Sequence, residues 1–208
     1  MGRKISVADL RNIHEEHIRW LSTVGEEGCC ADLRKAKLSG VKLSKVNLSK
    51  ANMSSVDLSS ANLWGIKLKS TNLKGANLRG TYLLHGTDLT GADMSEADLT
   101  KANLSNAELG NVKLIKSNLY KTKLNGANLS GADLSDANLS KTKLNKTKLS
   151  GANLQNACLI SAYLKDAGDL TIEQLSKVKT LYKSKLDAEL MGQVKEKYPH
   201  LLEKIKRI

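Results

Sequence analysis

The sequence is poor in aromatic residues: phenylalanine is absent, and aromatic residues make up only 3% of the 208 positions. This shortage excludes a core built on large rings, so the core must be aliphatic. No stretch approaches the roughly 18 apolar residues that a membrane-spanning helix needs. The first 20 residues carry charge throughout and lack the apolar run of a signal peptide. We therefore expect no membrane segment and a cytoplasmic location.

Cysteine is also scarce, at three residues: Cys29, Cys30 and Cys158. An odd number cannot pair completely within one chain, and in the expected compartment reduced thiols are the natural state. The vicinal pair Cys29 and Cys30 has two interpretations. It is either a redox element or, the reading we favour, two small residues that pack where the chain enters the repeats described below.

Motifs for common enzyme chemistry are missing. There is no phosphate-binding Gly-x-x-x-x-Gly-Lys loop, no dinucleotide-binding glycine turn, no Gly-x-Ser-x-Gly elbow and no Cys-x-x-Cys. His14 and His17 stand three residues apart rather than the four of the zinc-protease motif, and no third ligand follows nearby. We predict that the protein is not an enzyme and has no metal, cofactor or small-molecule substrate.

The sequence contains a five-residue repeat from Ala31 to Asp166. A leucine, or a methionine at positions 53 and 94, recurs every five residues up to Leu83 and, after one extra residue, from Leu89 to Leu164. The 11 repeats before the extra residue and the 16 after it make 27. The position two residues before each leucine is always Ala, Val, Thr, Ser or Ile.

A period of five fits neither a helix nor a plain strand, because a helix would distribute the leucines around its whole circumference. In an extended tripeptide the leucine and the small residue two places before it point to the same side. The two remaining residues, mostly Ser, Gly, Asn, Asp and Lys, can then turn the chain. The pattern predicts a solenoid whose interior receives one large and one small residue per repeat.

Runs such as Gly-Ala-Asn-Leu-Ser-Gly-Ala-Asp-Leu-Ser at 126–135 resemble the pentapeptide repeat family, and the flanking segments are similar to those of uncharacterised bacterial members. The resemblance implies an all-β solenoid, a right-handed quadrilateral parallel β-helix with four repeats per coil and nearly seven coils. Some members of that family mimic duplex DNA and act on DNA gyrase. Such mimicry requires an acidic rod, whereas residues 31–166 carry 20 basic and 10 acidic side chains here.

The segments on either side of the repeats have helical patterns. Ser6 and Asp9 form a capping-box pattern before an amphipathic stretch, which predicts an N-terminal helical cap over 1–30. After the β-helix at 31–166, a C-terminal helical cap is predicted over 167–208. In it, Thr171 and Gln174 open a helix with Leu175, Val178 and Leu181 on one side, and a second helix follows Asp187. Leu201, Leu202, Ile205 and Ile208 predict a last amphipathic turn.

The extra residue lies between Leu83 and Leu89, where Gly86 is expected to let the chain bulge near His85. Residues about 20 apart should stack in a four-repeat coil. Trp64, Tyr82 and Leu84 then form an outward apolar patch, a candidate interaction surface. The alternative is that these side chains merely cover the bulge or a folded-back terminus. A smaller outward pair is Ile115 and Tyr120.

The net charge of +12 resides mostly on the repeats, and lysines cluster at Lys141, Lys143, Lys146 and Lys148, with Lys123 stacked under Lys143. These five residues are candidate polyanion contacts, and a basic stripe can bind nucleic acid by releasing counterions. The alternative is that they keep the rod soluble.

The leading functional hypothesis is a non-catalytic scaffold or interaction module with an unidentified protein partner. The alternative is binding of nucleic acid or another polyanion, and a DNA mimic acting on gyrase ranks below both.

Overall fold

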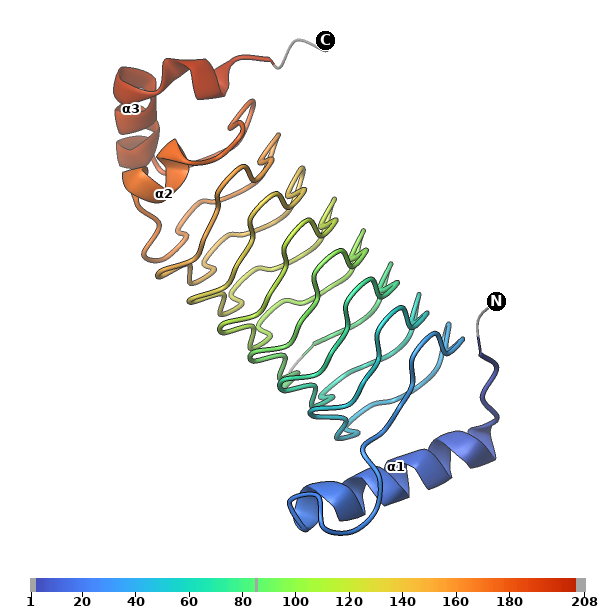
Figure 1. Ribbon diagram of the computed structural model, residues 1–208. Helices are drawn as coiled ribbons and strands as arrows, with labels where there is room; N and C mark the ends of the chain where they lie inside the picture. The colour runs from blue at the N-terminus through green and yellow to red at the C-terminus, as the bar shows by residue number, and fades with distance from the viewer. Residues whose placement is uncertain (1–2, 85, 205–208) are drawn as a thin grey trace.

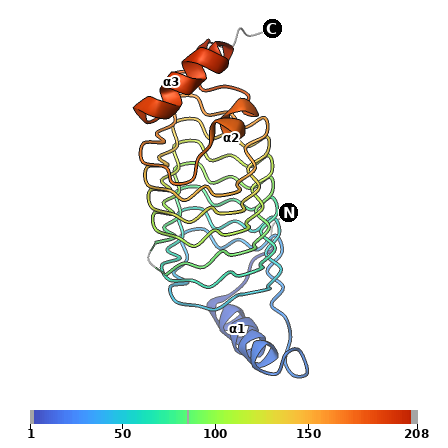
Figure 2. The ribbon, with the colours of Figure 1, turned by 90° about the vertical axis from the view of Figure 1, so that its left-hand side faces the viewer.

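The computed structural model describes residues 3–84 and 86–204, which form a rod of stacked coils with helices at both ends (Figure 1). Each coil is held to the next by parallel bridges one residue long, formed by the residue that precedes each leucine. The first pairs are Asp32 with Asn52 and Lys37 with Asp57. Bridges recur every five residues and their partners lie 20 residues apart. Each coil therefore consists of four pentads, one for each side of the rod. The coils are stacked one above another (Figure 2).

The corners between the sides are tight turns with one residue in the left-handed region. Wherever the structure describes it, the second residue after each repeat leucine or methionine has a positive φ, as at Lys101 (φ 61°) and Gly131 (φ 68°). Its amide donates to a carbonyl of the next coil, for example from Lys101 to Tyr120 at 3.0 Å. Glycine adopts this conformation without strain and Asn or Asp tolerates it, but Lys and Ser also occupy it, as at Lys101 and Ser55.

The interior contains only the two residues per pentad that the alternation of side chains predicts. From Leu48 to Leu149 every repeat leucine or methionine is at most 1% exposed. The partner position is filled mostly by buried alanine or threonine. The threonine hydroxyls remain hydrogen-bonded, as when Thr122 donates to the Leu99 carbonyl at 2.7 Å. A buried polar group without a partner would be costly, so these bonds make threonine acceptable in an apolar tube.

The extra residue before Leu89 is absorbed at one corner without loss of register. Bridge partners are 20 apart up to Asn62 and Tyr82, 21 apart from Lys67 and Asp88 to Tyr82 and Asn103, and 20 apart again from Asp88 and Glu108 to Lys148 and Gly168. Gly86 has a φ of 77°, which suits a glycine in the expanded corner. His85, which the sequence placed at the bulge, lies outside the described residues.

Helix α1 (Val7–Ser22) lies across the N-terminal end of the rod (Figure 1). It begins with the predicted capping box, in which the Asp9 amide donates to Ser6 Oγ at 3.1 Å. Ile13 packs against the core, and the buried His17 accepts a hydrogen bond at Nδ1 from the Ala31 amide at 3.0 Å. Burial lowers the pKa of His17, so the neutral imidazole holds α1 to the first coil.

The C-terminal helices are α2 (Ile172–Ser176), α3 (Ala188–Lys197) and the 3₁₀-helix η1 (Pro199–Leu202). The capping box predicted for α2 is present, since the Gln174 amide donates to Thr171 Oγ1 at 3.2 Å. However, the helix ends before Val178 and Leu181, which we predicted to extend its apolar side. Both are buried, but in the segment that follows α2. Of the predicted last amphipathic turn, Leu201 and Leu202 lie in η1, and positions 205 and 208 are outside the described residues.

Parallel pairing continues beyond Asp166 into the segment that the sequence assigned to the C-terminal cap. Cys158 pairs with Thr180 and Tyr163 with Lys185, in each case 22 residues apart. The segment that contains α2 is thus looped out between the bridges at Gly168 and Thr180, and the chain then rejoins the columns of Cys158 and Tyr163. This return places Lys185 on the outer surface directly beyond Tyr163.

All three cysteines are free, with Cys29 and Cys30 exposed and Cys158 half-buried in a coil. Burial raises the pKa of the Cys30 thiol, whose Sγ lies 3.4 Å from the Lys50 carbonyl oxygen. A raised pKa disfavours the reactive thiolate and so speaks against the redox interpretation of Cys30, but its exposure does not fit the predicted packing either. None of the helices among residues 3–84 and 86–204 is long and apolar enough to cross a membrane.

Candidate interaction surface

The four sides of the rod differ in the residues that they present. We number the faces in the order in which the chain first reaches them, at Asp32, Lys37, Lys42 and Asn47, and define each by its column of bridged residues. The first, second and fourth columns all contain acidic side chains, such as Asp93, Asp98 and Glu108. The third face does not. Its column is Lys42, Asn62, Tyr82, Asn103, Lys123, Lys143, Tyr163 and Lys185.

The lysines of the third face have no anionic partner within the part of the chain that the structure describes. Lys123 and Lys143 are bridged through their backbones and both are exposed. Neither they nor Lys185 lies within ion-pair distance of an acidic group among the described residues. The stacking predicted for Lys123 and Lys143 from the sequence is therefore present, and their charges are free to meet an external anion.

A second basic column runs along the corner between the second and third faces. Lys101, Lys121 and Lys141 occupy the left-handed turn position in successive coils, with φ of 61°, 59° and 58°. The Nζ atoms of Lys121 and Lys141 lie 5.2 and 5.7 Å from the centre of the Tyr120 ring. Interaction of the Tyr120 hydroxyl with the Lys141 ammonium, with a smaller effect of Lys121, lowers the pKa of this tyrosine.

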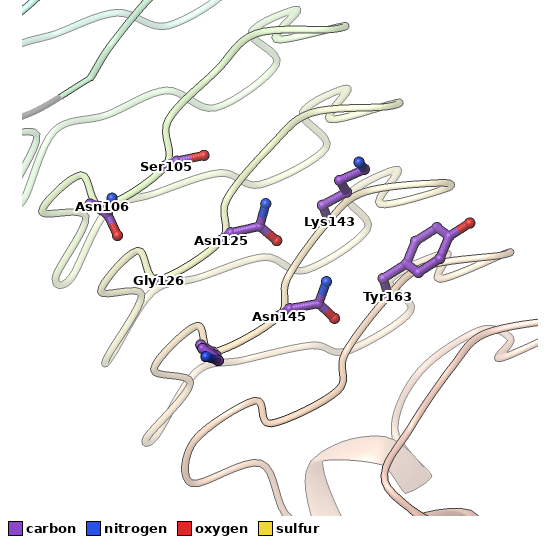
Figure 3. Close-up of a pocket in the computed structure, with 8 residues that line it drawn as sticks. Ser105, Asn106, Asn125, Gly126, Lys143, Asn145 and Tyr163 are labelled. Atoms are coloured by element: carbon purple, nitrogen blue, oxygen red, sulfur yellow. The ribbon is translucent and has the colours of Figure 1, made fainter.

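Tyr163 stands between two depressions near the C-terminal end of the third face. One, of about 540 Å³, is also lined by Asn125, Lys143 and Lys146, and the labelled side chains are drawn in Figure 3. The other, of about 690 Å³, is bounded by Tyr163 and Lys185. The Nζ atom of Lys185 lies 5.0 Å from the centre of the Tyr163 ring, a cation–π contact.

One polar atom of the first depression lacks a partner. The side-chain oxygen of Asn125 is buried and accepts no hydrogen bond. The equivalent residue of the next coil, Asn145, accepts one from the Lys165 amide at 3.2 Å. A buried acceptor without a donor is destabilising, and a ligand that brings an N–H or O–H group would satisfy it.

The predicted apolar patch lies at the other end of the same face. Tyr82 belongs to the third column and is 55% exposed, while Trp64 occupies the corner beside it and is 39% exposed. Leu84 is in the layer next to Trp64, since the Gly65 amide donates to the Leu84 carbonyl at 3.1 Å, but this leucine is half-buried. Lys45 Nζ lies 4.6 Å from the Trp64 ring centre. The apolar patch and the lysines, two separate candidates in the sequence, thus share one face.

The predicted lysine cluster does not hold together as a unit. Lys143 is on the third face, and Lys141 and Lys146 are at its two corners, but Lys148 belongs to the column of the fourth face. Residues close in sequence lie around the circumference, whereas neighbours along the rod are 20 apart. Steps of 20 from Lys141 would have found Lys121 and Lys101. Lys185 escapes this rule because of the 22-residue step over α2.

Solved structures similar to this chain are themselves pentapeptide repeat proteins. HetL, involved in heterocyst differentiation regulation in the cyanobacterium Nostoc sp. strain PCC 7120, is 32% identical over 67% of this chain and 76% of its own, with a TM-score of 0.29. Rfr23 from the cyanobacterium Cyanothece 51142 is 27% identical over 62% and 90%, with a TM-score of 0.26. QnrB1, a plasmid-mediated fluoroquinolone resistance protein, is 21% identical over 85% and 86%, with a TM-score of 0.39.

With TM-scores this low, the superpositions add no argument of their own, and a comparison with proteins of curated function found no match. The family is decided by the repeats themselves. The family model described as pentapeptide repeats matches in eight copies at residues 30–65, 57–106, 83–119, 92–131 and 132–167, about two thirds of the chain. Together with the twenty-residue spacing of the bridges, this match shows that the chain belongs to the pentapeptide repeat family.

Proposed function

We propose that this protein is a non-catalytic interaction module, a stiff rod that presents its third face to another macromolecule. The observation that carries the proposal is the composition of that face. Its column contains no acidic residue and gathers exposed lysines and tyrosines. Buried leucines fill the interior of the described coils, which supports a role through the outer surface rather than through an internal reaction site.

The same proposal includes the finer features of the rod. Membership of the family supports a right-handed quadrilateral β-helix of nearly seven coils, with helical caps at 1–30 and 167–208 around the coils of 31–166. Contacts of α1 with the first coil, through Ile13 and His17, support a capping role at the N-terminal end. A cytoplasmic location belongs to the proposal as well.

The partner that fits this face is a polyanion. Lys123 and Lys143 are exposed and form no ion pair with any described residue, and Lys101, Lys121 and Lys141 add a parallel basic column at the corner. Two adjacent columns of like charge raise the local potential and attract a polymer that carries regularly spaced negative charges. A DNA mimic acting on gyrase is disfavoured for the same reason, because mimicry needs negative charge where this face is positive.

Titration of the protein with inorganic polyphosphate, followed by calorimetry at several salt concentrations, tests this proposal. Polyphosphate carries charge but neither bases nor side chains. We expect binding that weakens steeply as salt is raised. The double variant Lys123→Glu/Lys143→Glu should lose it, whereas the matched double variant Lys67→Glu/Lys148→Glu on the fourth face should retain most of it. Equal effects of the two variants, or no binding to the wild type at low salt, would contradict the proposal.

A further inference from the structure

We propose that the polyanion bound by the third face is single-stranded nucleic acid, held by base stacking on the face's tyrosines as well as by its phosphates. This inference rests on the proposed function and names the partner. It starts from the position of the aromatic side chains. Tyr82 and Tyr163 are the only tyrosines in any bridged column, and both lie in the third. Both are exposed, at 55% and 37%.

The order of residues along the column suits an unpaired strand. Between the two tyrosines lie Asn103, Lys123 and Lys143, and Lys185 follows beyond Tyr163. With layers about 4.8 Å apart, the column from Tyr82 to Lys185 spans about 24 Å. Proteins that bind single strands combine such a basic track with aromatic side chains on which successive bases stack. In a duplex the bases are stacked on one another, so their faces are not accessible for stacking on the tyrosine rings.

Tyr163 is placed to receive a base. It stands between the two depressions, and Lys185 lies over one face of its ring at 5.0 Å. Lys185 is the one lysine over this ring among the described residues, and the proposed base stacks on the opposite side of the ring. Lys143 and Lys146 line the same depression and can meet the phosphates that flank such a base.

Asn125 distinguishes a nucleotide from a simple polyanion. Its buried side-chain oxygen lines the first depression and lacks a donor. The bridging phosphates of a polynucleotide carry no proton to donate at neutral pH, whereas bases carry N–H groups. Asn125 and Tyr163 line the same depression, so a base N–H group can reach the Asn125 oxygen once the amide turns outward, whereas a chain of phosphates offers no donor.

The test measures fluorescence anisotropy of a labelled oligodeoxythymidylate of about 15 nucleotides with the full-length protein. We expect wild-type binding, with Tyr163→Leu weakening it roughly tenfold and Tyr163→Phe leaving it nearly unchanged. Asn125→Ala should also weaken it. Neither Tyr163→Leu nor Asn125→Ala should change the affinity for polyphosphate. The corresponding duplex should bind more weakly than the single strand.

Two results would overturn the inference while leaving the proposed function intact. One is unchanged oligonucleotide affinity in Tyr163→Leu despite loss of polyphosphate binding in Lys123→Glu/Lys143→Glu. The other is a preference for duplex over single strand. Far-ultraviolet circular dichroism and thermal melting of each variant establish that lost binding is not lost folding. Tyr163 lies outside the leucine core, so Tyr163→Leu is expected to fold.

Discussion

The second and third faces share one backbone but use their outer side chains differently. The column of the second face is mostly Asp and Asn, and each of five successive members accepts a hydrogen bond from the amide two residues later, as Asn138 does from Ser140 at 3.1 Å. Asn138 also donates to Asn118 in the next coil at 3.2 Å. In the third column only Asn62 and Asn103 accept in this way.

This difference separates side chains that hold the rod together from side chains that are left for a partner. The side-chain amides and carboxylates of the second face form hydrogen bonds with the protein's own backbone and with neighbouring coils. The lysines and tyrosines of the third face forgo those hydrogen bonds and remain exposed. The third face has lysine and tyrosine at outward positions where asparagine would form hydrogen bonds within the rod. This difference in composition indicates that the third face is the binding surface.

The largest expected effect is on stability. It tests whether buried leucines of the second and third faces contribute equally to the unfolding free energy. Leu139 and Leu144 belong to the second and third faces of one coil, and both are at most 1% exposed. Because both leave a cavity in the same tube, Leu139→Ala and Leu144→Ala should each lower the free energy of unfolding by about 2–5 kcal/mol. Urea denaturation followed by circular dichroism measures this. A marked inequality would mean that the core, and not only the surface, distinguishes the faces.

Truncating an outward side chain should cost more stability on the second face than on the third. Asn138→Ala removes the hydrogen bonds to Ser140 and Asn118 and should cost about 1–2 kcal/mol of unfolding free energy. Lys143→Ala in the same coil should change the unfolding free energy by no more than about 0.5 kcal/mol. The same denaturation experiment compares them. Equal costs would remove the distinction between structural and free side chains.

A swap should convert part of the third face into the second. Lys143→Asn provides a side-chain acceptor for the Asn145 amide, in the way that Asn103 serves Ser105 at 3.2 Å. We expect a gain of about 0.5–1 kcal/mol in unfolding free energy together with weaker polyphosphate binding. A variant that is stabilised and still binds as tightly as the wild type would show that Lys143 takes no part in binding.

The smallest effect concerns Tyr120, at the corner between the two faces. Its pKa is lowered mainly by the Lys141 ammonium, so Lys141→Ala should raise it toward the ordinary value of about 10. Spectroscopic titration of tyrosinate in a protein in which Tyr120 is identified by comparison with Tyr120→Phe measures the change. An unchanged pKa would mean that Lys141 does not approach the ring in solution.

The sequence predicted the interior well because every repeat states its buried positions directly. Stacking of Lys123 and Lys143, or of Trp64 near Tyr82, needed only the twenty-residue step. Where that step changes, prediction from sequence stopped: the 22-residue spacing that joins Tyr163 to Lys185 depends on a looped-out segment that has no counterpart in the repeat. Lys148 does not share a face with Lys143, because residues five apart in the sequence lie on adjacent faces of the rod, on either side of a corner.

The expanded corner at Gly86 has a consequence for how this surface can change over time. The coils on both sides of it keep their pairing although the chain has gained a residue there. Insertions at this corner are thus tolerated without rewriting the rest of the rod, and the corner borders the third face next to Tyr82. A longer loop inserted at this corner would project beside the exposed lysines and tyrosines. Binding specificity could then change through the loop alone, with the coils left as they are.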